Sequence, residues 1–236
     1  MNRSEPARSM PPPWMRVVLV AEVVGYVAVF AAYVWMALPD AGRLGAWNAA
    51  FAVFAIGAPV ALNLLHGDRP ADSGLRVDTL AGSAREVAVA TGVMGAGVVA
   101  VGLAAGGFHW DTGARFAERA GLYLGWGLVQ QYLLQAFALR RLRQARLPTP
   151  AAVALAAGLF ALVHAPNWPL VAVTFPAGVV WSVLFCRRAN LLTLGLAHAG
   201  LAVLLYHAWP MAWHMGLAIG PEYLQRTADV ARFGWP

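Results

Sequence analysis

Long apolar runs separated by short polar connectors organise this chain. Most are about 20 residues long, the length that carries a helix across a bilayer. The runs lie at residues 17–38, 46–65, 87–107, 120–139, 151–164, 170–185 and 191–209. A further apolar piece at 211–219 is short, so an eighth span stays open. The pattern predicts an all-α, polytopic transmembrane helical bundle of about seven to eight helices.

Composition agrees with this fold class. The 236 residues are 60% hydrophobic and 12% charged, which is about half the charged fraction of a soluble domain. The single cysteine, Cys186, excludes an intramolecular disulfide and zinc sites built from several thiolates. We predict a cytoplasmic segment at 1–15, a transmembrane domain at 16–220 and a polar tail at 221–236.

The distribution of arginine predicts the orientation. All 17 basic residues are arginine. With the amino terminus inside, the inner segments hold twelve arginines, and the outer loops hold only Arg43, Arg115 and Arg119. The positive-inside rule therefore predicts a cytoplasmic amino terminus. We expect an integral protein of a bacterial inner (plasma) membrane. Because the charge of +6 falls in connectors between spans, we expect membrane lipids as partners and no nucleic acid.

Three glutamines stand out in the fourth apolar run: Gln130, Gln131 and Gln135. An unpaired primary amide in an apolar environment costs about 1–3 kcal/mol, so these side chains should face polar groups. On a helix, Gln131 and Gln135 share one face and Gln130 is turned by about 100°. We predict that the three line a cleft.

Two histidines within the apolar runs, His164 and His198, are candidates to meet the glutamines. At about 1.5 Å per residue, Gln130 and His198 lie roughly 15 Å from the inner ends of their helices, and His164 lies roughly 20 Å from its own. Ionisable groups inside a membrane are candidate functional groups, although a single histidine can also fix helix packing. The similar depths predict a shared polar site.

Other polar and aromatic residues have simpler interpretations. His207 and His214 lie beside tryptophans near the end of a span, where aromatic rings form an interfacial belt. Tyr123 and Trp126 are interpreted as helix-packing residues.

Three segments together resemble a known family. Phe160-x-x-x-His164 precedes Pro166-Asn167, and a later helix ends in Arg187-Arg188-Ala189-Asn190 and continues to His198. These segments resemble the second and third motifs of the CPBP membrane proteins, which include CAAX prenyl proteases and bacteriocin-processing proteins. The family's first motif is Glu-Glu-x-x-x-Arg, and here Gln130-Gln131-x-x-x-Gln135 takes its place. The resemblance covers residues 121–206.

The resemblance implies a glutamic-type intramembrane peptidase in which a glutamate and two histidines activate water. It carries the catalytic role to His164 and His198, whereas Gln130 and Gln131 have no carboxylate to accept a proton. General-base catalysis typically contributes 10²–10⁴-fold, so its loss alone could silence an enzyme. Ala202 stands four residues after His198, where the family often has Asn or Asp.

Two functions therefore stay open. The first is a CPBP-like peptidase acting on membrane-associated peptide or protein substrates, in which a histidine or Glu22 serves as the base and the glutamines orient water or stabilise an oxyanion. The second is an inactive pseudo-protease that binds or scaffolds a membrane client. Glu22 and Glu86 are otherwise interpreted as acids that pair near the membrane interface.

Cofactor binding is a weaker alternative. His164 and His198 are the protein ligands if a divalent metal binds, but two imidazoles fall short of the three ligands of a typical zinc site. A haem or quinone protein that uses the same histidines, and a transporter, are further alternatives.

Overall fold

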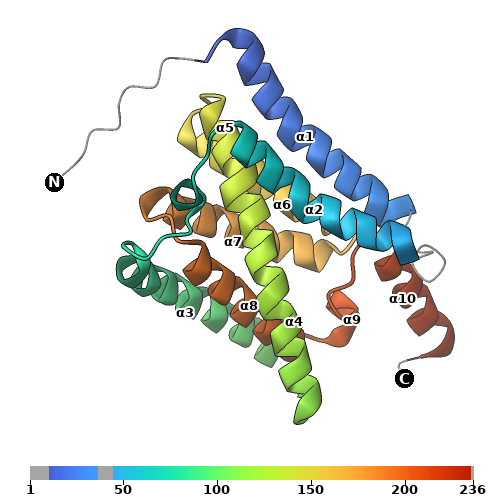
Figure 1. Ribbon diagram of the computed structural model, residues 1–236. Helices are drawn as coiled ribbons and strands as arrows, with labels where there is room; N and C mark the ends of the chain where they lie inside the picture. Colours follow the sequence, from blue (N-terminus) through green and yellow to red (C-terminus); the bar gives the residue numbers. More distant parts are fainter. Residues whose placement is uncertain (1–10, 37–44, 235–236) are drawn as a thin grey trace.

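The computed structural model describes residues 11–36 and 45–234, and this part of the chain consists of helices and their connections, with no strand (Figure 1). The elements are α1 (Pro13–Met36), α2 (Gly45–Leu65), η2 (Pro70–Ser73), α3 (Leu80–Ala105), α4 (Ala114–Gln131), η3 (Tyr132–Leu139), α5 (Arg140–Gln144), α6 (Thr149–Leu162), α7 (Trp168–Arg187), α8 (Leu191–Ala208), α9 (Met211–His214) and α10 (Gly220–Phe233). The prediction of an all-α helical bundle is confirmed.

The seven predicted runs each correspond to a helix, but the eighth apolar piece does not span. Helix α9 ends at His214, and the next residues include Met215 and Leu217 with φ of 47° and 62°, so the chain turns instead of continuing as a helix. The predicted tail forms α10. Most of the predicted amino-terminal segment, residues 1–10, lies outside the described residues.

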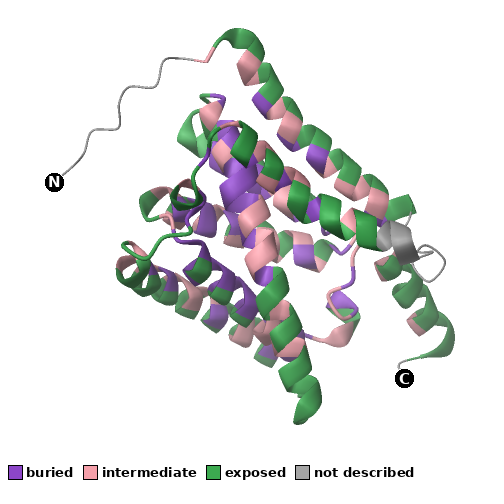
Figure 2. Ribbon diagram, viewed as in Figure 1, coloured by how far each residue is buried: buried purple, intermediate pink, exposed green. Residues whose placement is uncertain are grey.

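In the part of the chain that the structure describes, four helices are long and apolar enough to cross a membrane: α1, α3, α7 and α8. The outer surface of the bundle carries many exposed apolar side chains. On α3, for example, Val89 and Val93 are 65% and 70% exposed. Figure 2 shows that exposed residues cover much of α1 and α3, while buried residues gather on the middle helices. An apolar exterior of this extent suits lipid rather than water.

One continuous helical rod runs through the middle of the bundle. Helix α4 passes directly into η3, a stretch of π-helix, and then into α5. Residues 134–139 of η3 are all buried. A π-helical turn rotates the side chains that follow it relative to an α-helix and is often found at functional sites. In this chain it begins directly after Gln131.

The rod packs closely against α8 through two glycines. A Cβ on Gly195 would lie 2.3 Å from Leu128 Cδ2 and 3.1 Å from Leu128 Cα, and a Cβ on Gly127 would lie 3.0 Å from the Gly195 carbonyl oxygen. Small residues at such crossings let membrane helices approach backbone to backbone. This crossing sets the distance between the side chains of α4 and α8.

We predict that Gly195→Val separates α4 from α8 and lowers stability by about 1–3 kcal/mol, the usual cost of overpacking a tight contact. Thermal unfolding of the purified protein in detergent measures the effect. Gly200→Val is the matched control on the same helix, because a Cβ there meets no atom within 4 Å. Equal melting temperatures for the two variants would contradict the proposed role of the crossing.

The end of the bundle that carries Arg140, Arg141, Arg187 and Arg188, here called the arginine-rich end, contains a buried ionic network. Arg141 is fully buried, and Asp68 accepts hydrogen bonds from Arg140 Nη2 at 2.6 Å and Arg141 Nη1 at 3.1 Å. Burial alone would raise the pKa of the Asp68 carboxyl, but the hydrogen bonds and charges of the two arginines outweigh burial and hold this pKa below its ordinary value. The network fixes the connector after α2 against α5.

Replacing Asp68 by Asn leaves the buried guanidinium of Arg141 with less counter-charge, and removing one partner of such a pair costs about 3–5 kcal/mol. Because the pKa of Asp68 is lowered by folding, its carboxylate stabilises the fold above the unfolded-state pKa of about 3.9, and this stabilisation is lost as pH falls through the folded value. We therefore expect Asp68→Asn to melt earlier than the native protein at pH 7, and the gap to close in acid below about pH 4.

Melting temperatures across this pH range test the prediction, with Asp78→Asn as the control. Asp78 also pairs with an arginine, Arg76, but its side chain is 61% exposed. A gap that persists unchanged in acid would rule out the ionic explanation.

Candidate active site

The central contact of the site joins α4 to α8. Gln131 Nε2 lies 3.1 Å from His198 Nδ1, and Gln131 is fully buried while His198 is 8% exposed. Gln131 is the last residue of α4, and His198 lies one turn from Gly195. The glycine crossing therefore brings the amide and the imidazole into hydrogen-bonding distance.

Gln135 completes a chain of amides. Its Nε2 donates to Gln131 Oε1 at 3.1 Å, and its side chain is fully buried inside the π-helical stretch. The prediction that Gln131 and Gln135 share a face and meet polar partners agrees with this geometry. The Oε1 atom of Gln135 is buried and has no hydrogen-bond partner.

His164 lies in the turn just after α6, two residues beyond the helix end. Its Nδ1 is 2.8 Å from the Phe160 carbonyl oxygen, and the side chain is buried. Asn167 follows and caps α7 by accepting a hydrogen bond from the Leu170 amide at 3.3 Å. The Asn167 amide also donates to the carbonyl oxygens of His214 and Ala218, at 3.0 Å each, which ties this turn to the segment after α9.

Aromatic rings fix the planes of both imidazoles. Trp181 of α7 stacks on His198 with ring centroids 4.7 Å apart and an interplanar angle of 22°. Phe160 meets both histidines edge to face, at 5.1 Å from His164 and 5.8 Å from His198. Sequence reasoning missed Trp181, because no motif or spacing in the sequence distinguishes it from the other tryptophans.

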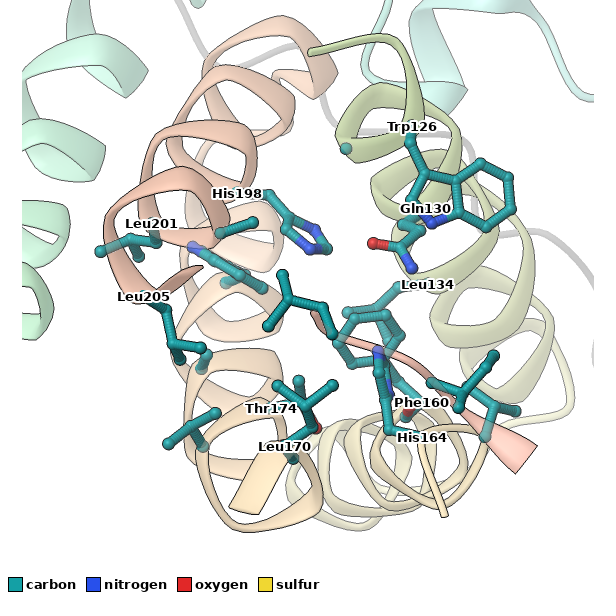
Figure 3. A pocket seen from close by; sticks show the side chains of 18 of the residues that line it. Trp126, Gln130, Leu134, Phe160, His164, Leu170, Thr174, His198, Leu201 and Leu205 are labelled. Atoms are coloured by element: carbon teal, nitrogen blue, oxygen red, sulfur yellow. Dashed lines mark hydrogen bonds between the residues drawn. The ribbon is translucent and has the colours of Figure 1, made fainter. Parts of the chain in front are cut away.

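A cavity of about 680 Å³ lies beside these residues, and Gln130, His164 and His198 line it. In Figure 3 the side chains of Gln130 and His198 point toward one another across the cavity, and His164 lies below them next to Phe160. Most of the other lining side chains are apolar. The structure brings the predicted site residues together, but of the three glutamines expected to line a cleft only Gln130 lines the cavity, with His164 and His198. Gln131 and Gln135 are fully buried instead, because they bond to His198 and to each other.

Tyr123, Trp126 and Ala202 are also among the residues that line the cavity. Tyr123 and Trp126, which the sequence suggested as helix-packing residues, line the cavity, and Trp126 is 42% exposed. Ala202 also lines it and contributes no polar group. The cavity wall therefore lacks the amide or acid that the resemblance led us to expect four residues after His198.

The hypothesis that Glu22 acts as the base is wrong. Glu22 Oε1 is 2.8 Å from His66 Nε2, and its Oε2 lies 3.0 Å from Arg141 Nε as an ion pair. It belongs to the network at the arginine-rich end and does not line the cavity. Glu86 pairs with Arg188 at 2.7 Å, in agreement with its interpretation as a paired acid.

The interpretation of His207 and His214 as part of an interfacial belt is also wrong. Both are buried, at 1% and 0% exposure, and both rings lie near His109 and Tyr206. His207 Nδ1 bonds the Val203 carbonyl oxygen at 2.8 Å. The sequence could not separate a belt from a buried cluster, because the loop that carries His109 covers these rings.

The donor set at the cavity does not fit a typical zinc centre. Within residues 11–36 and 45–234, no group of three or more His, Cys, Asp or Glu side chains is placed to hold a metal ion. His164 and His198 supply two imidazoles, one of which already meets an amide at Nδ1. No step is therefore assigned to a metal at this cavity.

The comparisons with known proteins agree with the site. Residues 115–204 match the family model described as type II CAAX prenyl endopeptidase Rce1-like. This segment is Rce1-like. The Rce1-like segment extends from the start of α4 into α8 and includes all five predicted site residues. No match was found among curated proteins or solved structures.

The resemblance to the CPBP family is confirmed by this match. The family whose model matches is one of type II CAAX prenyl endopeptidases, and the similarity covers residues 115–204 of the 236. Together with the four helices able to cross a bilayer, it identifies the chain as an integral membrane protein.

The hydrogen bonds assign opposite tautomers to the two imidazoles. With the two amides oriented as they are here, Gln131 Oε1 accepts from Gln135 and Gln131 Nε2 faces His198 Nδ1, and this orientation assigns the proton of a neutral His198 to Nε2. A carbonyl oxygen only accepts, so His164 donates from Nδ1 and keeps a lone pair on Nε2. A carboxylate at position 131 would instead accept from Nδ1 of His198 and leave Nε2 able to take a proton.

We predict that Gln131→Glu reverses the tautomer of His198. Nitrogen-15 shifts of the histidine rings in micelles distinguish the two forms, with His198→Gln to assign the signals. The native protein should show a protonated Nε2 and the variant a protonated Nδ1. A native signal with the proton already on Nδ1 would contradict the assigned amide chain.

Proposed function

We propose that this protein binds membrane-associated peptides or proteins in the Rce1-like cavity and does not hydrolyse them. The observation that carries the proposal is the hydrogen bond from the Gln131 amide to His198 Nδ1. An amide in this place cannot accept a proton, and it also selects the His198 tautomer that cannot act as a base through Nε2. In serine protease triads, a comparable acid-to-amide change lowers kcat about 10⁴-fold by the same effect on the tautomer.

The remaining features support ligand binding. The cavity is largely apolar, and its few polar groups include His198 Nε2–H, the His164 Nε2 lone pair, the Gln130 amide and the Glu222 carboxylate. A mostly apolar pocket with a few convergent polar groups is the usual form of a ligand site. Such a site suits an extended peptide or a lipid-modified chain end whose polar group lies at the histidines.

A second candidate is an active peptidase that uses His164 as its base. It is favoured by the Nδ1 bond from His164 to the Phe160 carbonyl oxygen, which leaves Nε2 free to accept a proton. Gln130, which points across the cavity, would then orient the water or stabilise the oxyanion. Cleavage by the native protein that is lost in His164→Ala would favour this candidate.

The proposal includes a location. We infer that the protein lies in a bacterial inner membrane with the arginine-rich end and the amino terminus in the cytoplasm. The exposed guanidinium groups of Arg187 and Arg188 support this, because arginine is enriched at the cytoplasmic ends of membrane helices. Membrane lipids and a membrane-associated peptide or protein are the partners of this proposal.

We predict that the double variant Gln130→Glu/Gln131→Glu gains hydrolysis that the native protein lacks. Restoring the carboxylates should raise the cleavage rate by about 10²–10⁴-fold, the usual contribution of a general base. Purified proteins would be incubated with prenylated and unmodified membrane peptides, with products measured by mass spectrometry and binding by fluorescence anisotropy.

Gln225→Glu, on α10, is the matched amide-to-acid control and should stay inactive. Adding His198→Ala to the double variant should abolish the gained activity. Cleavage by the native protein at a rate equal to that of the double variant would overturn the proposal. If neither the native protein nor any variant binds these peptides, membrane peptides are excluded as the ligand.

A further inference from the structure

Helix α10 has two chemically distinct faces. At 100° per residue, its charged and amide side chains fall on one side of the helix, with Phe233 at the helix end, and its other apolar and small residues fall on the opposite side. The polar side carries Glu222, Gln225, Arg226, Asp229 and Arg232. The opposite side carries Tyr223, Leu224, Thr227, Ala228, Val230 and Ala231.

The apolar side of α10 is largely uncovered by protein. Leu224 is 49% exposed, and Ala228 and Ala231 are also exposed. In Figure 1, α10 lies at the edge of the bundle, beside the end of α1. The closest approach is between Gly220 and α1, where a Cβ on Gly220 would lie 2.6 Å from Val34 Cγ1.

The place where α10 begins identifies what covers its apolar side. Val34 is near the end of α1, a helix long and apolar enough to cross the membrane, and the next residues, Trp35 and Met36, are 45% and 79% exposed. Tryptophan at such an end is typical of the membrane interface. Helix α10 thus begins beside the end of a helix that is able to cross the membrane.

The polar side of α10 is held in a defined orientation. Arg226 Nη1 donates to the Met215 carbonyl oxygen at 2.9 Å, and Arg226 Nη2 pairs with Glu222 at 2.5 Å. The two acids and two arginines on α10 balance in charge. A helix of this kind binds lipid through its apolar area, with no requirement for anionic headgroups.

We propose that α10 is an interfacial helix that lies in the lipid leaflet at the end of α1, with Leu224, Ala228 and Ala231 facing the lipid. Its first turn also contributes to the cavity, because Ile219 and Glu222 are among the lining residues. The lipid-bound helix therefore forms the part of the cavity wall nearest that leaflet. This surface is separate from the glutamines and histidines of the site.

Single cysteines on the two sides of α10 test the proposal in the full-length protein, with Cys186→Ala to remove the native thiol. Leu224→Cys, Ala228→Cys and Ala231→Cys probe the apolar side, and Gln225→Cys and Asp229→Cys are matched controls on the polar side. Each protein would be labelled with bimane and placed in nanodiscs of zwitterionic lipid. A nitroxide on the lipid and a water-soluble nitroxide would serve as quenchers.

The three apolar positions should show blue-shifted bimane emission and stronger quenching by the lipid nitroxide, and the two controls the reverse. Equal quenching of both sides by the water-soluble nitroxide would overturn the proposal. Cross-links between the apolar cysteines of two chains, with protection that persists in detergent, would overturn it in favour of a second copy of the protein. Peptide binding in the cavity is not required for either readout.

Discussion

The close crossing of α4 and α8 is the contact on which the candidate site depends. Gly127 and Gly195 have no side chain beyond hydrogen, so the two backbones approach until Gln131 meets His198. In an apolar bundle each buried polar group must find a partner within the protein. The crossing satisfies this requirement for the Gln131 amide and His198 Nδ1, and the same geometry determines which ring nitrogen of His198 carries the proton.

Physical constraints explain which features the sequence predicted. The seven helices follow from the length of the apolar runs, and the meeting of the glutamines with a histidine follows from the cost of an unpaired amide in hydrocarbon. Helix α6 ends two residues before the end of the predicted run at 164, because apolarity alone does not distinguish the turn at Val163 and His164 from a helix. The π-helical stretch after Gln131 was also missed, because it depends on packing rather than on local residue pattern.

Burial of charge was harder to predict than burial of amides. Arg141 belongs to a basic cluster that reads as a solvated helix end, yet it is fully buried because Asp68 and Glu22, distant in sequence, meet it there. His207 and His214 were misplaced for a similar reason, since a separate loop covers them. Only tertiary contacts reveal such partners. For Arg141, the acids at positions 22 and 68 were the one sequence feature that could have indicated a buried ion pair.

The motif residues divide into two groups by what the fold requires of them. Asn167 and Asn190 cap α7 and α8, and their loss would leave helix ends unsatisfied whether or not the protein cuts peptides. The acids of the first motif are not needed for the fold. A buried carboxylate is costly to desolvate, and an amide of nearly the same shape keeps one hydrogen bond to His198. Glutamine at position 131 thus preserves the packing of the Rce1-like segment while removing the charge that hydrolysis needs. If the protein binds a ligand without cutting it, glutamine in place of the first-motif glutamates avoids the cost of burying a carboxylate. The cavity can then keep its shape although the first-motif carboxylates are absent.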